Sequence, residues 1–178
     1  EALADERARR VEDQVEEAKR SVADFQAPFY TVAGDRFLEF EYLEPHEVLA
    51  DSGALPSFLT TRRVREAQNS EGLVFVFISH QWLGWDHPDP EGVQVVAMKN
   101  AVRFAAEEAG VPPSSLRIWL DMSSIPQTNP AVQKQVIASL PVFASVVDMF
   151  IVVAPNCRHT HTMKCCDAAS YRARGWGR

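Results

Sequence analysis

The stretch that decides the fold is Leu73-Val-Phe-Val-Phe-Ile-Ser-His80, which is followed by Gln81-Trp-Leu-Gly-Trp85. Its run of large apolar residues predicts a strand that is buried on both faces, as the central strands of parallel sheets are. The run ends on two polar residues, Ser79 and His80. Because ligands of open α/β sheets gather beyond the carboxyl ends of such strands, we look for chemistry at this end first.

Strand and helix patterns alternate after this point. Apolar runs predict further strands over 116–121 and 149–154, while periodicity and capping residues predict helices over 89–109 and 129–147 and the start of another at 168–178. Right-handed crossovers would then give an α/β fold, a parallel sheet with flanking helices. A sheet of three strands leaves an open edge, so we expect the domain to continue past the C-terminus of this chain.

Two of the predicted helices carry more detailed expectations. In the helix over 89–109, Asp89 is expected to cap the first turn, and one apolar face is expected to be buried. That face consists of Val93, Ala97, Ala101, Val102, Ala105 and Ala109. In the helix over 129–147, Pro141 is expected to produce a kink near the middle.

The first seventy residues precede this domain, which we assign to 71–178. Residues 1–27 predict an amphipathic helix, because their apolar residues recur in alternating steps of four and three. Such a helix either lies against its own domain or acts as a coiled-coil arm. Residues 28–70 are an irregular α/β lead-in, in which 36–43 has the partial alternation of a strand. A short helix is expected over 45–50 and mostly loop over 53–70.

Composition restricts the partners and the compartment. The chain has 178 residues, a formal net charge of −6 and no run rich in Lys or Arg, which argues against nucleic acid as the main partner. Three cysteines, with Cys165 next to Cys166, form no disulfide framework and suit a reducing compartment. No apolar run approaches the roughly 20 residues of a membrane span, and the charged N-terminus is no signal peptide. We therefore expect a cytoplasmic protein without a membrane partner.

An ordered set of short elements resembles the TIR-like superfamily, and most closely its heterokaryon-incompatibility (HET)-like branch. The likeness covers roughly 73–178. The elements are Phe77-Ile-Ser-His80, Ile118-Trp-Leu-Asp121 with Ile125-Pro-Gln127, Ser139-Leu-Pro141, Phe150-Ile-Val-Val153 and Ser170-Tyr-Arg-Ala-Arg-Gly-Trp176.

This resemblance implies a flavodoxin-like sheet and an intracellular signalling domain of stress or immunity. It also implies self-association and, in many relatives, hydrolysis of the N-glycosidic bond of NAD, with NAD as substrate and no further cofactor required. A Glu after the third strand carries the chemistry in those enzymes, but no acidic residue follows Arg174-Gly-Trp176 in this chain. The catalytic residue therefore stays unassigned and is expected beyond Arg178. The alternative function is a non-enzymatic, self-assembling interaction module.

The candidate contacts for NAD or a related nucleotide stand at the carboxyl ends of the strands and on the terminal helix. They are Ser79, His80, Trp82, Asp121, Ser123, Ser124, Tyr171 and Arg174, with Asn156 nearby. Each also has a structural interpretation. Asp121 either faces a ligand ribose or organises the backbone amides of Ser123 and Ser124, and Trp82 and Trp85 either stack on a ligand ring or anchor their loop.

Other kinds of site receive less support from the sequence. Ser79 and His80 are adjacent, so they leave a strand on opposite faces, which disfavours a hydrolase triad with Asp121. No Gly-x-Gly-x-x-Gly or P-loop motif occurs, which argues against a Rossmann dehydrogenase or a P-loop ATPase. A small metal-dependent hydrolase is a third hypothesis. It would rest on Cys157, His159, His161, Cys165 and Cys166, whose one-residue gaps fit no common zinc finger, so we assign no metal.

Overall fold

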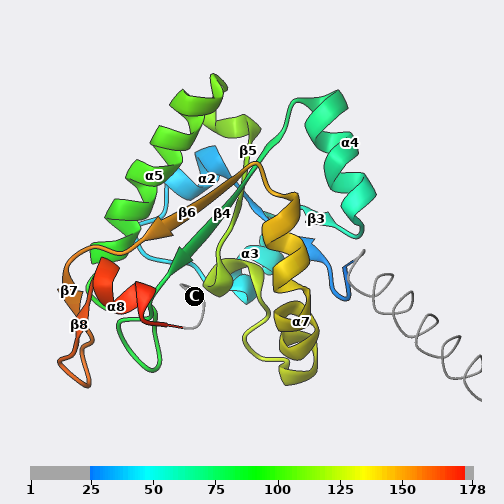
Figure 1. Ribbon diagram of the computed structural model, residues 1–178. Coiled ribbons are helices and arrows are strands. Elements are labelled where there is room, and N and C mark those ends of the chain that lie inside the picture. Colours follow the sequence, from blue (N-terminus) through cyan, green and yellow to red (C-terminus); the bar gives the residue numbers. More distant parts are fainter. Residues whose placement is uncertain (1–24, 175–178) are drawn as a thin grey trace, which may run out of the picture.

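The computed structural model describes residues 25–174, so the predicted N-terminal helix over 1–27 lies almost wholly outside the described residues. Strands and helices alternate from β4 to β6 (Figure 1). The strands are β1 (Phe29–Tyr30), β2 (Val32–Ala33), β3 (Ser57–Phe58), β4 (Val74–His80), β5 (Leu116–Trp119), β6 (Met149–Val153), β7 (Cys157–Arg158) and β8 (Cys165–Cys166). The helices are α2 (Gly34–Leu38), α3 (His46–Asp51), α4 (Thr61–Glu71), α5 (Val93–Ala109), η1 (Pro113–Ser115), α6 (Asp121–Ser124), α7 (Pro130–Val146) and α8 (Ala168–Arg172).

The main sheet has four strands in the order β2-β5-β4-β6. β4 pairs in parallel with both β5 and β6, which confirms the α/β class and the parallel relation of the three predicted strands. β2 is an addition that the sequence did not predict, and it pairs antiparallel with β5 through only two residues. Because β5 and β6 lie on opposite sides of β4, the helices that lead to them, α5 and α7, cover opposite faces of the sheet (Figure 1).

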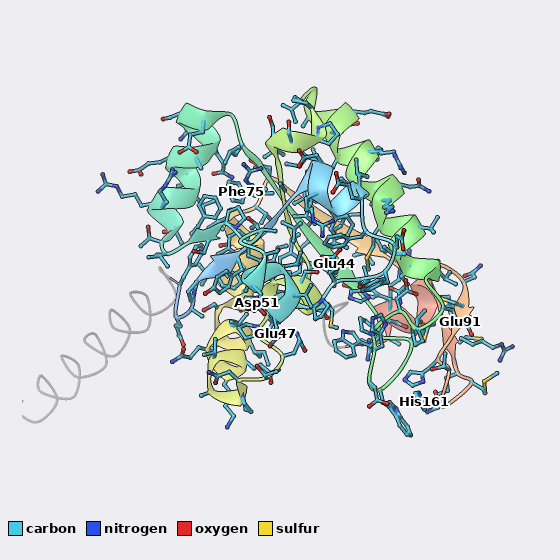
Figure 2. All side chains as sticks on the ribbon, turned by 180° about the vertical axis from the view of Figure 1, so that it is seen from behind. Glu44, Glu47, Asp51, Phe75, Glu91 and His161 are labelled. Carbon is cyan, nitrogen blue, oxygen red and sulfur yellow. The ribbon has the colours of Figure 1, made fainter. Side chains whose placement is uncertain are left out.

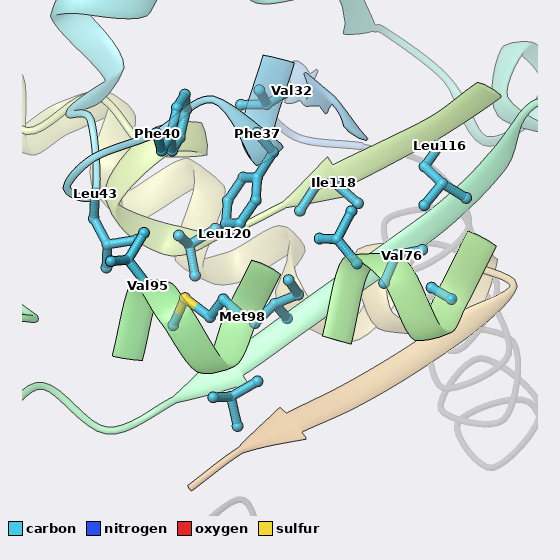
Figure 3. Close-up of a cluster of buried hydrophobic side chains, with 14 of the residues drawn as sticks. Val32, Phe37, Phe40, Leu43, Val76, Val95, Met98, Leu116, Ile118 and Leu120 are labelled. Carbon is cyan, nitrogen blue, oxygen red and sulfur yellow. The ribbon is translucent and has the colours of Figure 1, made fainter. Parts of the chain in front are cut away.

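Both faces of β4 are buried, as its apolar run predicted. Val76 and Ile78 face α5 and α2 and belong to a core that also contains Phe37 and Met98 (Figure 3). Side chains alternate along a strand, so Phe75 and its second neighbour Phe77 face the other way, toward α4 and α7. The strand therefore joins two separate hydrophobic cores.

The second core is built from aromatic rings. Phe77 is stacked between Trp119 of β5, with ring centroids 4.1 Å apart, and Phe150 of β6, with centroids 4.9 Å apart. Phe75, which Figure 2 labels, contacts Phe58 edge-on at 4.9 Å. The row of rings crosses three strands and forms a flat, apolar surface beside α7.

The lead-in differs from its prediction in two places. The strand predicted over 36–43 is wrong, because Gly34–Leu38 forms α2 and buries Phe37. The loop predicted over 53–70 is also wrong, because it contains most of α4. The helix signals of α4 lie at its ends: the side chain of Thr60 accepts a hydrogen bond from Arg63 N, and Gly72 ends the helix at φ 65°. The short helix predicted over 45–50 is confirmed as α3.

The two crossover helices confirm their predicted features only in part. The helix start predicted at Asp89 is wrong, because α5 starts at Val93 with Gly92 as its N-cap residue, but Asp89 Oδ2 still accepts from Val95 N in the first turn at 2.7 Å. The predicted buried face is confirmed at Val102 and Ala105, but Val93 is exposed and Gln94 is buried instead. In α7, Asn129 caps the first turn as expected, and Pro141 lies inside the helix without ending it.

The segment after β6 is more ordered than the polar loop that the sequence suggested. β7 and β8 form an antiparallel hairpin, and Thr160 at its end donates from its backbone N to Leu83 O at 2.7 Å. This bond joins the hairpin to the loop after β4. Figure 2 places His161 at the outer end of the hairpin. Asp167 then caps α8, which ends at Arg172, earlier than the predicted helix over 168–178.

Candidate functional site

A cavity of about 500 Å³ opens at the carboxyl ends of the parallel strands. The stacked rings of Phe77, Trp119 and Phe150 form one wall, and apolar side chains of α7 form another. Six of the predicted contact residues lie on its lining, namely Ser79, His80, Trp82, Asp121, Tyr171 and Arg174. A flat ring with a few polar substituents matches this combination of surfaces, because ligand sites pair apolar walls with a small number of polar groups.

Ser79 faces the cavity and bonds to the terminal helix. Its Oγ lies 2.6 Å from the hydroxyl of Tyr171 on α8. The next residue, His80, points to the opposite face of the sheet and makes no bond to Ser79, as alternation along a strand requires. A Ser-His nucleophile pair is therefore absent, which agrees with the weak support that the sequence gave to a triad.

His80 lies in a network of buried polar groups. Its Nδ1 is 2.9 Å from Oε1 of Gln94, and its Nε2 is 2.9 Å from Oδ1 of Asp121. The Gln94 amide nitrogen donates to the carbonyl oxygens of Gln81 and Pro88, so its oxygen must face the histidine. An amide oxygen can only accept, and Nδ1 therefore carries a proton.

The second nitrogen of His80 faces a carboxylate, so both ring nitrogens act as donors and the ring is positively charged. Burial opposes this charge, but the attraction of Asp121 and the hydrogen bonds to Asp121 and Gln94 outweigh it and raise the pKa of His80. Burial likewise opposes ionisation of Asp121, but His80 and the donors around the carboxylate lower the pKa of Asp121. With both nitrogens occupied, His80 has no free site for accepting a proton from a substrate.

Asp121 is the point where this network reaches the cavity. Its Oδ1 also accepts from Met122 N at 2.7 Å, and its Oδ2 accepts from the indole nitrogen of Trp82 at 2.7 Å. The Asp121 side chain keeps 30% of its surface exposed, whereas His80 keeps 1%. Asp121 therefore presents a fixed negative charge to the cavity. Its bond to Trp82 anchors the loop after β4, while Trp82 also lies on the cavity lining, so both the anchoring and the ligand-stacking interpretation of Trp82 remain open.

Three of the residues considered at the sequence level lie elsewhere. Ser123 and Ser124 are fully buried: the Oγ of Ser123 donates to Glu44 O at 2.7 Å, and the Oγ of Ser124 accepts from Leu120 N. Neither serine lines the cavity, and Asn156 does not either. The expectation that Asp121 organises the amides of these serines is wrong, since its carboxylate takes the amide of Met122 instead.

The Cys/His segment does not assemble a metal site in the described structure. Residues 25–174 contain no group of three or more His, Cys, Asp or Glu side chains that could hold a metal ion. His161 stacks on Trp85, with ring centroids 4.8 Å apart, and Trp85 is 66% exposed and absent from the cavity lining. Trp85 thus contacts the hairpin and is no part of the cavity.

Sequence reasoning missed several residues that complete the site. Gln94 fixes the orientation of His80, and its burial could have been read from Met98 and Val102, which lie four and eight residues later on the same helical face. Phe150 and Ile137 line the cavity but are partly exposed. As apolar residues inside an apolar pattern, they carried no signal that distinguished them from the core.

Three comparisons with known proteins were without a match. No family model, curated protein or solved structure matches the chain. Across residues 25–174, no helix has both the length and the apolar character needed to cross a membrane. What the described residues establish is a mixed α/β domain with a cavity at the carboxyl edge of its parallel strands.

The bond between Ser79 and Tyr171 yields a first prediction. The variant Tyr171→Phe should lose about 1 kcal/mol of unfolding free energy, because one hydrogen bond between partly buried hydroxyls is removed. The amides of α8 should also exchange faster with deuterium, since this bond ties the helix to β4. Tyr42→Phe is the matched control, because Tyr42 is 58% exposed. Equal effects of the two variants would contradict the role given to Tyr171.

Proposed function

We propose that this chain is a TIR-like module that binds NAD, or a related nucleotide, in the cavity beside α7. The observation that carries the proposal is the meeting of six residues, chosen from the sequence for this role, on one cavity with a wall of aromatic rings. The strand order supports it as well. Numbered along the chain, the three parallel strands β4, β5 and β6 lie in the order 2-1-3, with which the flavodoxin-like order 2-1-3-4-5 begins.

The chemistry of the lining suits the parts of a nucleotide. A planar base can stack on the exposed part of Phe150, which continues the row of Phe77 and Trp119. Asp121 Oδ2 accepts one bond from Trp82 and can accept a second from a ribose hydroxyl. Arg174 lies at the same cavity and offers a guanidinium to a phosphate.

Cleavage of the N-glycosidic bond would need a carboxylate beside the sugar, because the transition state carries positive charge there. Asp121 is the one carboxylate on the cavity lining among residues 25–174, and it is already paired with His80. We therefore propose binding as the function of the described site. The acid of a cleaving form belongs, in this proposal, to a segment beyond Arg178.

The test uses the arginines near the end of the described chain. Wild type should bind NAD saturably in calorimetry, and Arg174→Gln should weaken binding by about tenfold or more through the loss of a charged hydrogen bond. Arg172→Gln is the matched control, because Arg172 is exposed on α8 and absent from the cavity lining. Absence of saturable binding by wild type, or equal losses in both variants, would overturn the proposal.

A separate assay addresses cleavage. Release of nicotinamide, followed by chromatography, should be seen for a form extended past Arg178 and not for residues 1–178. Turnover by neither form would remove hydrolysis from the proposal while leaving binding intact. Turnover by both would assign the acid to the present chain, with Asp121 as the first residue to test.

One observation favours the second candidate function, a module that associates with further copies of itself. β6 is an edge of the four-stranded sheet in the described part of the chain, and Phe150 and Val152 on it are each 44% exposed. An unpaired edge that carries apolar side chains is a typical surface for pairing with another strand. Val152→Lys should then abolish concentration-dependent association in sedimentation, whereas Val96→Lys, at an exposed position on α5, should not.

A further inference from the structure

The two strands of the hairpin place Cys157 and Cys166 at directly opposite positions. Opposite residues of an antiparallel pair have α-carbons about 4.5–5.5 Å apart and side chains on the same face. A disulfide needs α-carbons about 4.4–6.8 Å apart, so the backbone already satisfies this requirement. Both thiols are free in the structure. We propose that Cys157 and Cys166 are a redox pair that forms a reversible disulfide on oxidation.

The surroundings favour this pairing over other reactions. Both cysteines line the same small pocket, together with Gln81, Leu83 and Gln94. The Sγ of Cys157 lies 3.1 Å from Pro155 O and 3.6 Å from the carbonyl oxygen of Cys166 on the partner strand. Burial, reinforced by the nearby Cys166 thiol, raises the pKa of Cys157. A raised pKa leaves less thiolate at neutral pH, so we expect the pair to react slowly with an oxidant.

Hydrogen peroxide is the oxidant that we assign to this site, because Cys157 is partly exposed, and the step balances with it. The Cys157 thiolate attacks one peroxide oxygen, the O–O bond breaks, and hydroxide leaves as water after taking a proton, which produces a sulfenic acid. The thiolate of Cys166 then attacks that sulfur and displaces a second water. Two thiols and one peroxide become one disulfide and two waters, with two electrons passed to the peroxide. A small thiol such as glutathione reverses the reaction by exchange.

The third cysteine is a built-in control. Cys165 is exposed and lies opposite Arg158, so its side chain points to the other face of the hairpin. A bond between the neighbours Cys165 and Cys166 would have to join side chains that leave the strand in opposite directions. Oxidation of Cys165 should therefore give different products from oxidation of the opposed pair.

The hairpin is connected to the cavity, which gives the disulfide a consequence. Cys166 immediately precedes Asp167, whose side chain caps α8 by accepting from Ser170 N at 2.7 Å. α8 in turn carries Tyr171 to Ser79. Closing the hairpin with a covalent bond restrains the residue from which α8 begins, so the amides of Ser170 and Tyr171 should exchange more slowly in the oxidised protein.

The experiment treats the reduced chain with hydrogen peroxide, blocks remaining thiols by alkylation and maps the peptides by mass spectrometry. Wild type should lose alkylation at Cys157 and Cys166 together and yield their two peptides joined by a disulfide, whereas oxidation of the exposed Cys165 should give no intramolecular cross-link. The melting temperature should rise by about 5 °C on oxidation, because a short loop is closed in the unfolded chain. The variant Cys165→Ser should behave like wild type, and Cys157→Ser and Cys166→Ser should show no rise.

The outcomes that overturn the proposal are distinct from these. They are a disulfide mapped to Cys165, a bond formed only between two molecules, and oxidation of Cys157 to the sulfinic acid without a cross-link. Slower exchange of α8 after oxidation, reversed by glutathione, would confirm the connection to the cavity. Unchanged exchange in protein with the mapped disulfide would overturn that connection. None of these readouts requires nucleotide binding, so the proposal can fail or stand independently of the proposed function.

Discussion

The variant His80→Leu should lower the free energy of unfolding by about 3 kcal/mol near pH 6, because it leaves the partner of a buried ion pair without its counter-charge. Asp121 would keep the bonds from Met122 N and Trp82, but Gln94 Oε1 would lose its only donor in the described structure. His161→Leu is the matched control, since His161 is exposed at the end of the hairpin. Urea denaturation of the three proteins measures the effect.

The loss should depend on pH in a direction set by the two pKa shifts. The pKa of His80 is raised, so its contribution is complete below the ordinary histidine value of about 6.5 and is lost as pH rises through the raised value. The pKa of Asp121 is lowered, so its contribution is complete above about 3.9 and is lost as pH falls through the lowered value. The difference between wild type and variant should therefore be greatest between about pH 4 and pH 6.5.

A more conservative variant tests the same charges without the risk that the protein fails to fold. Asp121→Asn keeps the shape of the side chain and an oxygen for Trp82 or Met122, but it removes the negative charge. The pKa of His80, followed by NMR titration, should then fall toward or below its ordinary value. A stability difference that stays constant across pH, or a His80 pKa unchanged in Asp121→Asn, would contradict the assigned charges.

Replacing Phe77 by alanine should cost about 3–5 kcal/mol of unfolding free energy, the range for truncating a buried aromatic residue. Phe77 is 5% exposed, and its ring is stacked between Trp119 and Phe150. Its removal leaves a hole in the row of rings that forms the cavity wall. The control Phe104→Ala removes the same atoms from a ring that is 56% exposed on α5, so it should change stability by about 0.5 kcal/mol or less.

A second substitution at the same position separates stability from binding. Phe77→Leu keeps most of the buried apolar volume, so its cost should be below about 1.5 kcal/mol. It nevertheless breaks the stack that holds Phe150 flat against its neighbour. If the wall contacts a ligand ring, Phe77→Leu should weaken NAD binding while unfolding changes little. Loss of binding only in proportion to loss of stability would assign Phe77 to the core alone.

How far the sequence predicts the fold can be followed on particular segments. β4 was predictable because every residue from Val74 to Ile78 is apolar and β-branched or aromatic, which at this length favours a strand covered on both faces over a buried helix. α4 was not, because most of its eleven residues are polar and its buried residues are Val64 and Ala67. The sequence does contain its N-cap residue, Thr60, and its terminal residue, Gly72. The apolar residues between them are too few to show a helical period, so the two ends could not be assigned to one helix.

Short windows also admit two periods at once. Phe37, Phe40 and Leu43 are spaced by three, which suits a helical turn, yet the same stretch shows partial alternation. In the structure the helix α2 begins at Gly34. A β-carbon at this position would come within 2.5 Å of Pro113 O and 2.9 Å of the Leu116 side chain, so the close packing requires glycine. That close approach depends on η1 and β5, which follow about eighty residues later, so a local window could not reveal it.

The candidate site was predictable where polar groups end strands, and unpredictable where tertiary packing decides. Ser79, His80 and Asp121 follow directly from strand ends that share one edge of a parallel sheet. Ser123 fails as a site residue because the one-turn helix α6 turns it inward, toward Glu44 O. Ile137 and Phe150 line the cavity because no other part of the described chain covers them. A local sequence pattern does not reveal which apolar residues stay uncovered.

The two-residue strand β2 also limits how copies of this domain could be joined. It closes one border of the sheet and offers too few free backbone groups for a ladder, whereas β6 presents five residues on the other border. Copies that join through their sheets must then use the same border twice, related by a two-fold axis. Such a contact uses the free border of both copies, so it produces a dimer that cannot grow further. Growth into a filament would require a head-to-tail surface on the helices, and the stoichiometry of association would reveal which geometry operates.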